Sequence, residues 1–472
     1  MAQKRSFARR AAKWAAAALA AAYLAAVTLP YVPHKAVSEE YKAAFAARSF
    51  TAQQAGSERA AYVTDNTDAL LCRLHMIRTA QKQIVLSTFD FDADQAGADM
   101  VAALLEAAGR GVQVYVLVDG LSGFMDIQRK ELFRVFASQP GVQLRIYNPV
   151  NLLAPWALQA RLHDKYLIAD DQVYLLGGRN TNDLFLGDYP TDERNADREL
   201  LVYCPEGAAG GSMAQLTDYF WQVWNSPAAK PFAPRPPKNA PQALQSLAQR
   251  SQTLRSAYPA AYRPWDWQAV TFETNCINLL ANPIQAGNKE PWVWYSLCRL
   301  MENARQAIVY TPYIICGSEM YADLTALCAG GVQLQFITNH MAGGSNPWGG
   351  ADYLNQKKRI WATGAQVYEY LGEHSCHTKA LVIDDRLSVL GSYNFDMRST
   401  YQDTELMLVV DSPTLNGLLR AEAARDMAQS RVMGPDGQYR EGEAFTPRAM
   451  GAGRGLLYGL LRVVTLPIRR FL

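Results

Sequence analysis

The sequence lacks an excess of charge of either sign, and it lacks paired cysteines. Lys and Arg number 46 and Asp and Glu 44 among 472 residues, which leaves a formal net charge of +2. Proteins dedicated to nucleic acids usually carry a clear basic excess, so the composition disfavours a nuclease and no nucleic-acid partner is expected. The seven cysteines include no Cys-x-x-Cys pair, the spacing typical of zinc and redox sites.

The features of disordered chains are also missing. Hydrophobic residues make up 49% of the sequence and charged residues only 19%. A chain of this length and composition has room for two or three domains, with cores large enough to need neither disulfides nor a structural metal. The sequence therefore predicts an ordinary folded body.

Charge is missing altogether between Trp14 and Val32. This run is close to the roughly 20 residues that span a bilayer, and Ala-rich apolarity all round gives it no polar face. Basic residues precede it, namely Lys4, Arg5, Arg9, Arg10 and Lys13. Residues 1–35 are therefore predicted to be a membrane anchor or signal segment, which places the protein at the cell membrane. Because basic flanks stay in the cytoplasm, we expect the folded body on the extracytoplasmic side.

The other end of the chain is apolar and basic as well. Residues 455–472 place leucines and valines at helical spacing, and their only charges are arginines. Such a segment is typical of a helix lying in an anionic membrane surface, but also of a terminal helix docked on its own domain. The sequence leaves both interpretations open.

Two stretches of the body repeat each other. Each contains three short apolar segments separated by helical stretches and by turns of the Gly-Val-Gln type. The matching segments are Ala80–Thr88, Gly111–Val118 and Gly141–Tyr147 in the first stretch, and Ala304–Thr311, Gly331–Ile337 and Gly364–Tyr370 in the second. This pattern predicts β-α-β units with buried sheets, and hence an α/β fold.

The repeat also sets the expected domain boundaries. Residues 36–226 are predicted to form the first domain and residues 243–435 the second. Between them, residues 227–242 are rich in proline and are predicted to be a linker. Residues 436–472 form a C-terminal tail.

Each half ends in the same constellation of a histidine, a lysine two residues later, an aspartate, a glycine-containing turn and an asparagine. The copies are His163, Lys165, Asp170, Gly177, Gly178 and Asn180, and His377, Lys379, Asp384, Gly391, Ser392 and Asn394. On a strand, residues two apart share a face, so each histidine and its lysine point the same way. A glycine turn lets the backbone approach a phosphate closely, and asparagine adds a donor.

This doubled pattern resembles the phospholipase D superfamily, and the apolar ends of the chain are similar to those of bacterial cardiolipin synthases. The resemblance implies two pseudo-twofold-related phospholipase D-like α-β-α domains with mixed sheets, and one active site at their interface. It implies that one histidine attacks phosphorus and the other protonates the leaving oxygen, with no cofactor or metal. By resemblance, His163 is the nucleophile and His377 the general acid.

The resemblance also assigns roles to neighbouring residues. Lys165, Lys379, Asn180 and Asn394 are expected to hold the phosphoryl oxygens. An acidic residue beyond each motif is expected to orient each histidine: Glu405 for His377 and Glu199 for His163.

Other positions of the motif are expected to matter less directly. Asp170 and Asp384 are expected to support the strand and its turn more than the chemistry. Gly178 stands where the family usually has serine, which removes from the first half a hydroxyl that Ser392 retains for the substrate. A metal site at His374, Cys376 and His377 is disfavoured, because the two histidines point opposite ways on a strand.

The function predicted from the sequence is that of a phosphatidyltransferase of cardiolipin synthase type. Its partners would be membrane phospholipids, with phosphatidylglycerol or a similar lipid as donor and acceptor. The alternatives are a phospholipase D that hydrolyses headgroups, a nuclease or other phosphodiesterase, and a non-catalytic membrane scaffold. An insertion at residues 149–160, beside His163, is expected either to dip into the membrane interface or to fold onto the core. The oligomeric state stays open.

Overall fold

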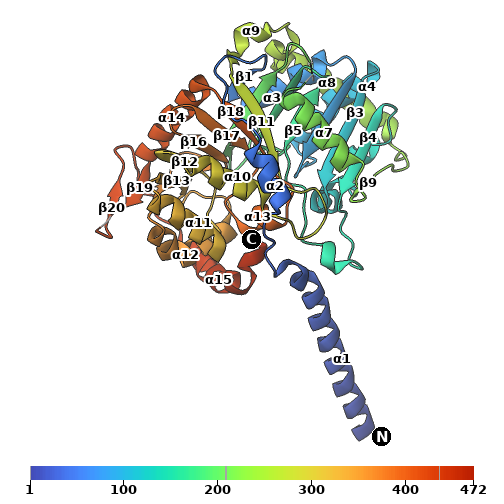
Figure 1. Ribbon diagram of the computed structural model, residues 1–472. Helices are drawn as coiled ribbons and strands as arrows, with labels where there is room; N and C mark the ends of the chain where they lie inside the picture. Colours follow the sequence, from blue (N-terminus) through green and yellow to red (C-terminus); the bar gives the residue numbers. More distant parts are fainter. Residues whose placement is uncertain (1, 208–209, 435) are drawn as a thin grey trace.

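Both repeated stretches fold around a mixed nine-stranded sheet (Figure 1). The computed structural model describes the backbone of residues 2–207, 210–434 and 436–472, and the side chains from Arg10 onward within these ranges. The side chains of Lys4, Arg5 and Arg9 therefore lie outside the described residues. The first sheet has the strand order β10 (Phe272–Glu273), β1 (Arg59–Val63), β8 (Glu199–Tyr203), β6 (Val173–Gly177), β5 (Tyr166–Ala169), β2 (Gln83–Thr88), β3 (Gln113–Asp119), β4 (Val142–Tyr147) and β9 (Ala229–Pro231).

The second sheet repeats this arrangement. Its order is β11 (Cys276–Ala281), β18 (Leu406–Asp411), β17 (Leu387–Gly391), β16 (Ala380–Ile383), β12 (Gln306–Tyr310), β13 (Gln333–Asn339), β14 (Gln366–Tyr370), β19 (Ser430–Met433) and β20 (Tyr439–Glu441). In both sheets three strands run parallel, β2, β3 and β4 or β12, β13 and β14, and the strands that follow the histidines pair antiparallel to them. The predicted α/β duplication is confirmed.

Helices cover the sheets in layers. The main helices are α2 (Glu39–Ala46), α3 (Asn66–Thr79), α4 (Gln95–Gly109), α6 (Glu131–Phe136), α7 (Ser212–Trp224), α8 (Ala240–Ala257), α10 (Trp292–Met301), α11 (Ser318–Ala329), α12 (Pro347–Ala362), α14 (Pro413–Ala428) and α15 (Ala452–Ile468). Shorter turns are η1 (Leu29–Tyr31), α5 (Gly120–Ser122), η2 (Gly123–Ile127), η3 (Pro155–Ala157), η4 (Pro259–Tyr262), α9 (Trp267–Val270), α13 (Met397–Tyr401) and η5 (Arg469–Phe471), and β7 (Asn195–Ala196) pairs with β15 (Ser375–Cys376).

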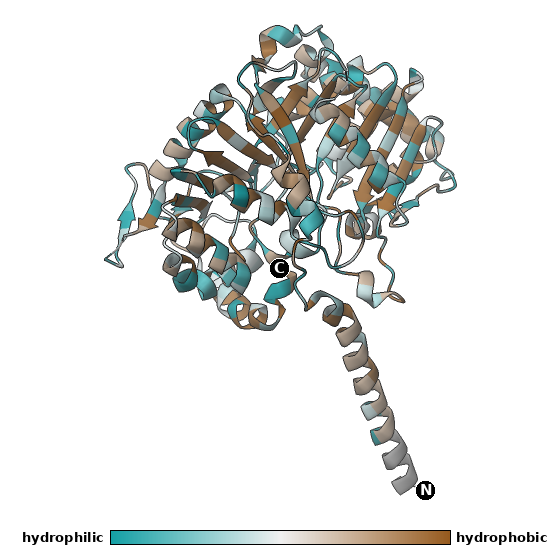
Figure 2. Ribbon diagram, in the orientation of Figure 1, coloured by the Kyte–Doolittle hydropathy of each residue, from teal (hydrophilic) through white to brown (hydrophobic). Residues whose placement is uncertain are grey.

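The core joins the two halves into one body. A central cluster contains side chains from both sheets, such as Val85 and Val382, together with Leu216 of α7 and Leu415 of α14. Separate outer clusters lie beneath α3, α4 and α8 on one side and beneath α10 and α11 on the other. Figure 2 shows the apolar strands that supply these clusters. Burying apolar area between the sheets is what holds the interface of the halves together.

The boundaries differ from the expected ones. Residues 227–242 are not a free linker, because β9 pairs with β4 at the edge of the first sheet. Helix α8, expected in the second domain, shares the first sheet's outer cluster through Leu247, and β10 pairs with β1. The chain therefore passes to the second sheet between β10 and β11, later than residue 243. At the other end Phe45 of α2, expected in the first domain, packs in the second sheet's outer cluster.

Helix α1 (Ala2–Thr28) extends away from the body (Figure 1). The segment Arg10–Tyr31 is long and apolar enough to cross a membrane by length and composition. Its side chains are largely exposed, with Trp14 at 76% and Leu24 at 62%. A solvent-facing helix this apolar is unfavourable in water, which is typical of a membrane anchor or a signal segment.

Candidate active site

Each histidine lies just before a buried strand, where the chain bridges to the other half. The bridge Leu162↔Thr404 precedes His163, whose backbone N–H donates to Thr404 Oγ1 at 3.2 Å. In the second half, β15 pairs with β7 and the backbone N–H of His377 donates to the Ala196 carbonyl at 2.8 Å. Both histidines are thereby fixed at the interface of the two halves, as the resemblance implied.

The acidic partners are crossed between the halves. His163 Nδ1 lies 2.8 Å from Glu405 Oε1, and His377 Nδ1 lies 2.7 Å from Asp197 Oδ2. Both carboxylates are fully buried. With Nδ1 of each ring held by a carboxylate, Nε2 is the nitrogen left for chemistry. The expected pairing of Glu405 with His377 is wrong, because the chain enters β18 beside the first half's histidine.

Glu199, expected to orient His163, is a structural residue. Its carboxylate accepts hydrogen bonds from Arg73 at 2.6 and 2.8 Å and lies 3.5 Å from Arg179 Nη1. The sheet register explains the difference. Glu199 pairs with Gly177, and the equivalent Gly391 pairs with Met407, so the counterpart of Glu405 lies two residues before Glu199. That residue is Asp197.

The two lysines of the motif lie against the histidines. Lys165 Nζ donates to the His163 carbonyl at 2.7 Å, and Lys379 Nζ lies 2.7 and 3.0 Å from the two ring nitrogens of His377. Burial lowers the pKa of Lys165 to about 7 and that of Lys379 to about 8. A buried cation of this kind is stabilised by an anionic ligand, which is what a phosphate group provides.

Each histidine forms a triad with its lysine and its carboxylate, and the two triads affect one another electrostatically. Burial, Lys165 and Lys379 hold the pKa of His163 well below its usual value. Burial and Lys379 lower the pKa of His377 to about 3, with a further contribution from Lys165. Because each histidine senses the lysine of the other half, the triads belong to a single site.

In each half, one phenylalanine ring packs against the histidine, a feature that the sequence did not reveal. Phe89 meets His163 edge to face at 5.2 Å between ring centroids, and Phe185 meets His377 at 4.8 Å. Lys165 Nζ also lies 5.2 Å from the Phe89 ring centre. These rings limit water around the histidines and hold their orientation.

The asparagines and the glycine turns flank the site. Asn180 and Asn394 are buried, and each amide has an Oδ1 atom with no partner in the described part of the chain. Asn394 Nδ2 donates to the Tyr313 hydroxyl at 3.2 Å. An amide Oδ1 accepts hydrogen bonds and Nδ2 donates them, so each amide retains an acceptor that no group in the described part of the chain uses.

The departure from serine at position 178 has a steric cause. A Cβ at Gly178 would lie 2.4 Å from Asp197 Oδ2, so any side chain there displaces the carboxylate that holds His377. In the second half Ser392 occupies the matching position and donates to Glu405 Oε2. Ser392 therefore supports the carboxylate. Its hydroxyl was expected to serve the substrate directly, but it is hydrogen-bonded to Glu405.

Asp170 and Asp384 lie at the far ends of β5 and β16 from the histidines. Asp170 accepts backbone hydrogen bonds from Gln81, Lys82 and Gln83 at 2.7–3.0 Å, and its φ of 53° forms a left-handed turn. Asp384 does the same for the start of β12, with a φ of 47°. Aspartate tolerates this backbone conformation better than most residues. Both therefore brace the strands at the ends away from the histidines.

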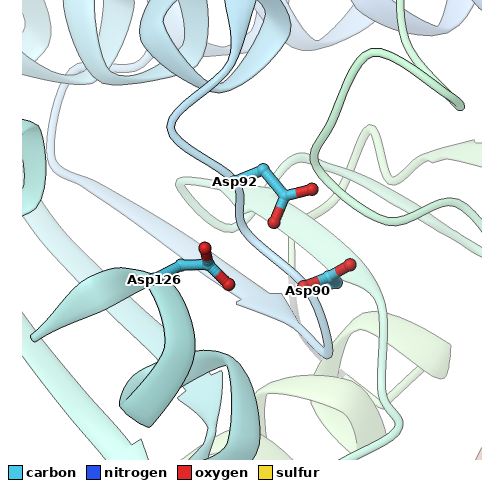
Figure 3. A group of neighbouring side chains, drawn as sticks. All are labelled: Asp90, Asp92 and Asp126. Carbon is cyan, nitrogen blue, oxygen red and sulfur yellow. The ribbon is translucent and has the colours of Figure 1, made fainter. Parts of the chain in front are cut away.

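Three carboxylates of the first half gather beside the site, and the described part of the second half has no such group. Asp90 and Asp92 follow β2 and face Asp126 of η2, with ligand atoms within 4.8 Å of one another (Figure 3). Burial and the neighbouring Asp90 charge raise the pKa of Asp92 to about 7. Mutual repulsion thus keeps part of this acidic cluster protonated near neutral pH.

Comparisons with known proteins agree with this geometry. The family model described as "Cardiolipin synthase, PLD-like domain" matches residues 74–224 and 297–427. The chain is 24% identical over 412 residues to cardiolipin synthase C of Escherichia coli, covering 75% of this chain and 81% of that one. It is 27% identical over 412 residues to an uncharacterised protein of Helicobacter pylori, with 77% and 78% covered.

A solved structure shows the same fold. A phosphatidylserine synthase of Haemophilus influenzae superposes with a TM-score of 0.62 at 14% identity, covering 92% of this chain and 99% of that one. The duplicated sheets, the paired histidine motifs at their interface and the two matches to the family model lead to one conclusion. The chain belongs to the cardiolipin synthase-like family of the phospholipase D superfamily, and is an enzyme of that superfamily.

Proposed function

We propose that the protein is a phosphatidyltransferase of cardiolipin synthase type that works through a phosphohistidine. The observation that carries the proposal is the crossed pair of carboxylates, which holds Nδ1 of both histidines at one interface, so that Nε2 is the ring nitrogen of each that no carboxylate binds. Two imidazoles presented in this way suit a double displacement, in which one is the nucleophile and the other moves the proton.

In the first step, the lone pair of His163 Nε2 attacks phosphorus and the bond from phosphorus to the leaving alcohol oxygen breaks. His377 donates its Nε2 proton to that oxygen. In the second step, His377 takes the proton from the hydroxyl of an acceptor lipid, whose oxygen attacks phosphorus and breaks the phosphorus–nitrogen bond. His163 is returned unchanged.

The difference between the two carboxylates supports this order. Burial raises the pKa of Glu405 to about 7, so its negative charge on His163 is reduced near neutral pH. Burial also disfavours the charge of Asp197, but Lys379 and the hydrogen bond from His377 outweigh it and lower the Asp197 pKa. A charged Asp197 opposes the effect of burial and Lys379, which lower the pKa of His377 to about 3, and so favours the proton on His377 that a general acid needs.

The lysines and asparagines are proposed to hold the phosphoryl oxygens. Lys165 and Lys379 lie against the two histidines, and the proposed donors of Asn180 and Asn394 are their Nδ2 groups, because an amide Oδ1 only accepts hydrogen bonds. Charge that builds on phosphorus oxygens in the transition state meets fixed donors in a buried setting, where each interaction is stronger than in water.

Transfer to a lipid hydroxyl is proposed to exceed hydrolysis. The spanning-length helix α1 keeps the site where phosphatidylglycerol and other lipid alcohols are concentrated. We infer from the basic flank before it that the body lies on the extracytoplasmic side. Relatives named cardiolipin synthase support the same type of reaction for this chain.

Product analysis tests the proposal. The full-length protein in mixed vesicles containing phosphatidylglycerol should make cardiolipin or a related bis-phosphatidyl lipid. Phosphatidic acid as the sole product at high acceptor lipid would make the protein a phospholipase D instead.

A further inference from the structure

An insertion in the first half presents apolar side chains to the outside. The segment before His163 carries Leu152, Leu153 and Trp156, whose exposed fractions are 66%, 88% and 57%. The equivalent segment of the second half, between Tyr370 and His377, is shorter. The insertion is tied down, because Asn148 Nδ2 donates to two of its carbonyls at 2.7 Å. Apolar surface exposed on an ordered loop is unfavourable in water and is typical of a contact with an apolar partner.

This loop meets the base of α1. The Tyr23 hydroxyl donates to the Leu152 carbonyl at 3.0 Å, and the Tyr31 hydroxyl donates to the Trp156 carbonyl at 2.9 Å. Tyr31 itself is 1% exposed, so it is a fixed part of the body. The loop therefore lies where the spanning-length helix leaves the protein.

Helix α15 has apolar side chains on two faces. Its inner face packs on α12 through Tyr458, Leu461 and Thr465, which are buried. Its outer face carries Leu456, Leu460 and Val463, which are 78%, 62% and 68% exposed. A terminal helix that only docked on its domain would turn polar residues outward. Of the two interpretations left open by the sequence, docking on the domain is confirmed for the inner face, and packing within the described residues does not account for the outer face.

The end of α15 reaches the same junction. Arg470 Nε donates to the Tyr31 carbonyl at 2.6 Å. Tyr31, at the base of α1, is therefore hydrogen-bonded both to the chain's last residues and to the loop. From Ala444 to the C-terminus every charged side chain is an arginine. Arg469 is paired with Asp352 at 2.8 Å, and the other arginines beside the apolar face match the anionic headgroups of a phospholipid surface.

This junction is connected to the active site. Arg398 donates to the carbonyls of Gln159 at 2.6 Å and Phe471 at 3.3 Å, and its Nε lies 3.0 Å from Asp403. Asp403 in turn accepts from the backbone N–H of Arg161, two residues before His163. The outer apolar segments are thus fixed relative to the catalytic histidine by a continuous set of hydrogen bonds.

We propose that Leu152, Leu153 and Trp156, together with the outer face of α15, form a membrane-docking face that lies in the surface of a phospholipid bilayer around the base of α1. The body is then in contact with the membrane surface, and α1 is not its only attachment to the membrane. The proposal goes beyond the reaction and does not depend on it, because it concerns only how the protein sits on lipid.

Site-specific fluorophores on the full-length protein test this face. Single cysteines are introduced by Leu153→Cys, Leu460→Cys or Val270→Cys, in a background in which the half-buried Cys276 and Cys328 are replaced by serine. Val270 is the matched control, because it is an apolar residue, 47% exposed, on α9 at the end of the molecule opposite α1 (Figure 1). An environment-sensitive dye is attached and each protein is placed in nanodiscs of phosphatidylglycerol and phosphatidylcholine.

The dyes at 153 and 460 should shift to shorter emission wavelengths, and lipids with a nitroxide on the acyl chain should quench them several-fold more than the dye at 270. Equal, weak quenching at all three positions would overturn the proposal. It would also be overturned if the signal at 153 and 460 rose with the protein-to-lipid ratio, because a second copy of the chain would then cover the face. Product formation is not read, so this outcome is independent of the proposed reaction.

Discussion

His163 and His377 each take an acidic partner from the opposite half of the chain, through hydrogen bonds of 2.8 and 2.7 Å. The histidines, lysines and asparagines were predictable, because their spacing repeats within the sequence. The acidic partners were not, because Glu199 directly precedes the apolar run of β8 just as Glu405 precedes that of β18. Only the strand register, and the contact of Glu199 with the distant Arg73, identify Asp197 as the counterpart.

Replacing either histidine should abolish turnover. With His163→Ala or His377→Ala, activity on phospholipid vesicles is expected to fall by about 10²–10⁴-fold or more, because each residue has a role that the other cannot take over. Initial rates of lipid product formation measure the loss. Near-normal activity in one of the two variants would mean that the halves do not share a site.

Asp197 and Glu199 should separate catalysis from stability. Asp197→Asn is expected to lower kcat by about two to four orders of magnitude, because His377 loses the carboxylate that orients and charges it. Glu199→Gln is expected to lower the free energy of unfolding by about 3–5 kcal/mol, because it leaves Arg73 and Arg179 buried without their partner.

Denaturant titration and steady-state kinetics on the same preparations distinguish the two effects. Per folded molecule, the Glu199→Gln protein should retain most of its kcat. A loss of kcat in Glu199→Gln as large as that in Asp197→Asn would show that Glu199 is needed for catalysis as well.

At the scale of elements, the strands of each repeat form where the alternation of apolar segments and turns predicts them. What the sequence misplaced is the passage between the halves. Proline-rich composition suggests a linker, but Ala229–Pro231 adds an edge strand to the first sheet, where a proline needs no ladder partner on its outer side. Helix α8 stays with the first half because its apolar stripe fits the surface of α4, a tertiary contact that composition does not encode.

The insertion before His163 gives a prediction at this scale. Leu153→Ser combined with Trp156→Ser should lower activity on phospholipid vesicles by on the order of tenfold, because two apolar side chains no longer favour the lipid phase. Activity on a short-chain soluble phosphodiester should change much less, since no hydrogen bond among the described residues joins either side chain to the histidines.

The matched control is Val270→Ser, which removes an exposed apolar side chain from the opposite end of the molecule. It should leave both activities close to the starting values. Equal loss on vesicles and on the soluble substrate in the Leu153/Trp156 double variant would show that the loop supports the fold and not the contact with lipid.

At the scale of the whole molecule, duplication places one site between two copies of one unit. Each half contributes a histidine and a lysine, and the bridges Leu162↔Thr404 and Ser375↔Asn195 bring the opposite carboxylate alongside. The sequence predicts this architecture because the motif occurs at the same place in both repeats. It does not predict the crossing, which follows from how the two sheets face one another across their shared core.

The central claim is a covalent phosphatidyl group on one histidine of this shared site. The direct measurement is mass spectrometry of full-length protein mixed with phosphatidylglycerol vesicles, quenched within the first turnover at alkaline pH, where phosphohistidine survives, and then digested. The account predicts a phosphatidyl adduct on the peptide that contains His163, and its absence in His163→Ala. An active enzyme with no adduct on either histidine, or with the adduct on His377 alone, would contradict it.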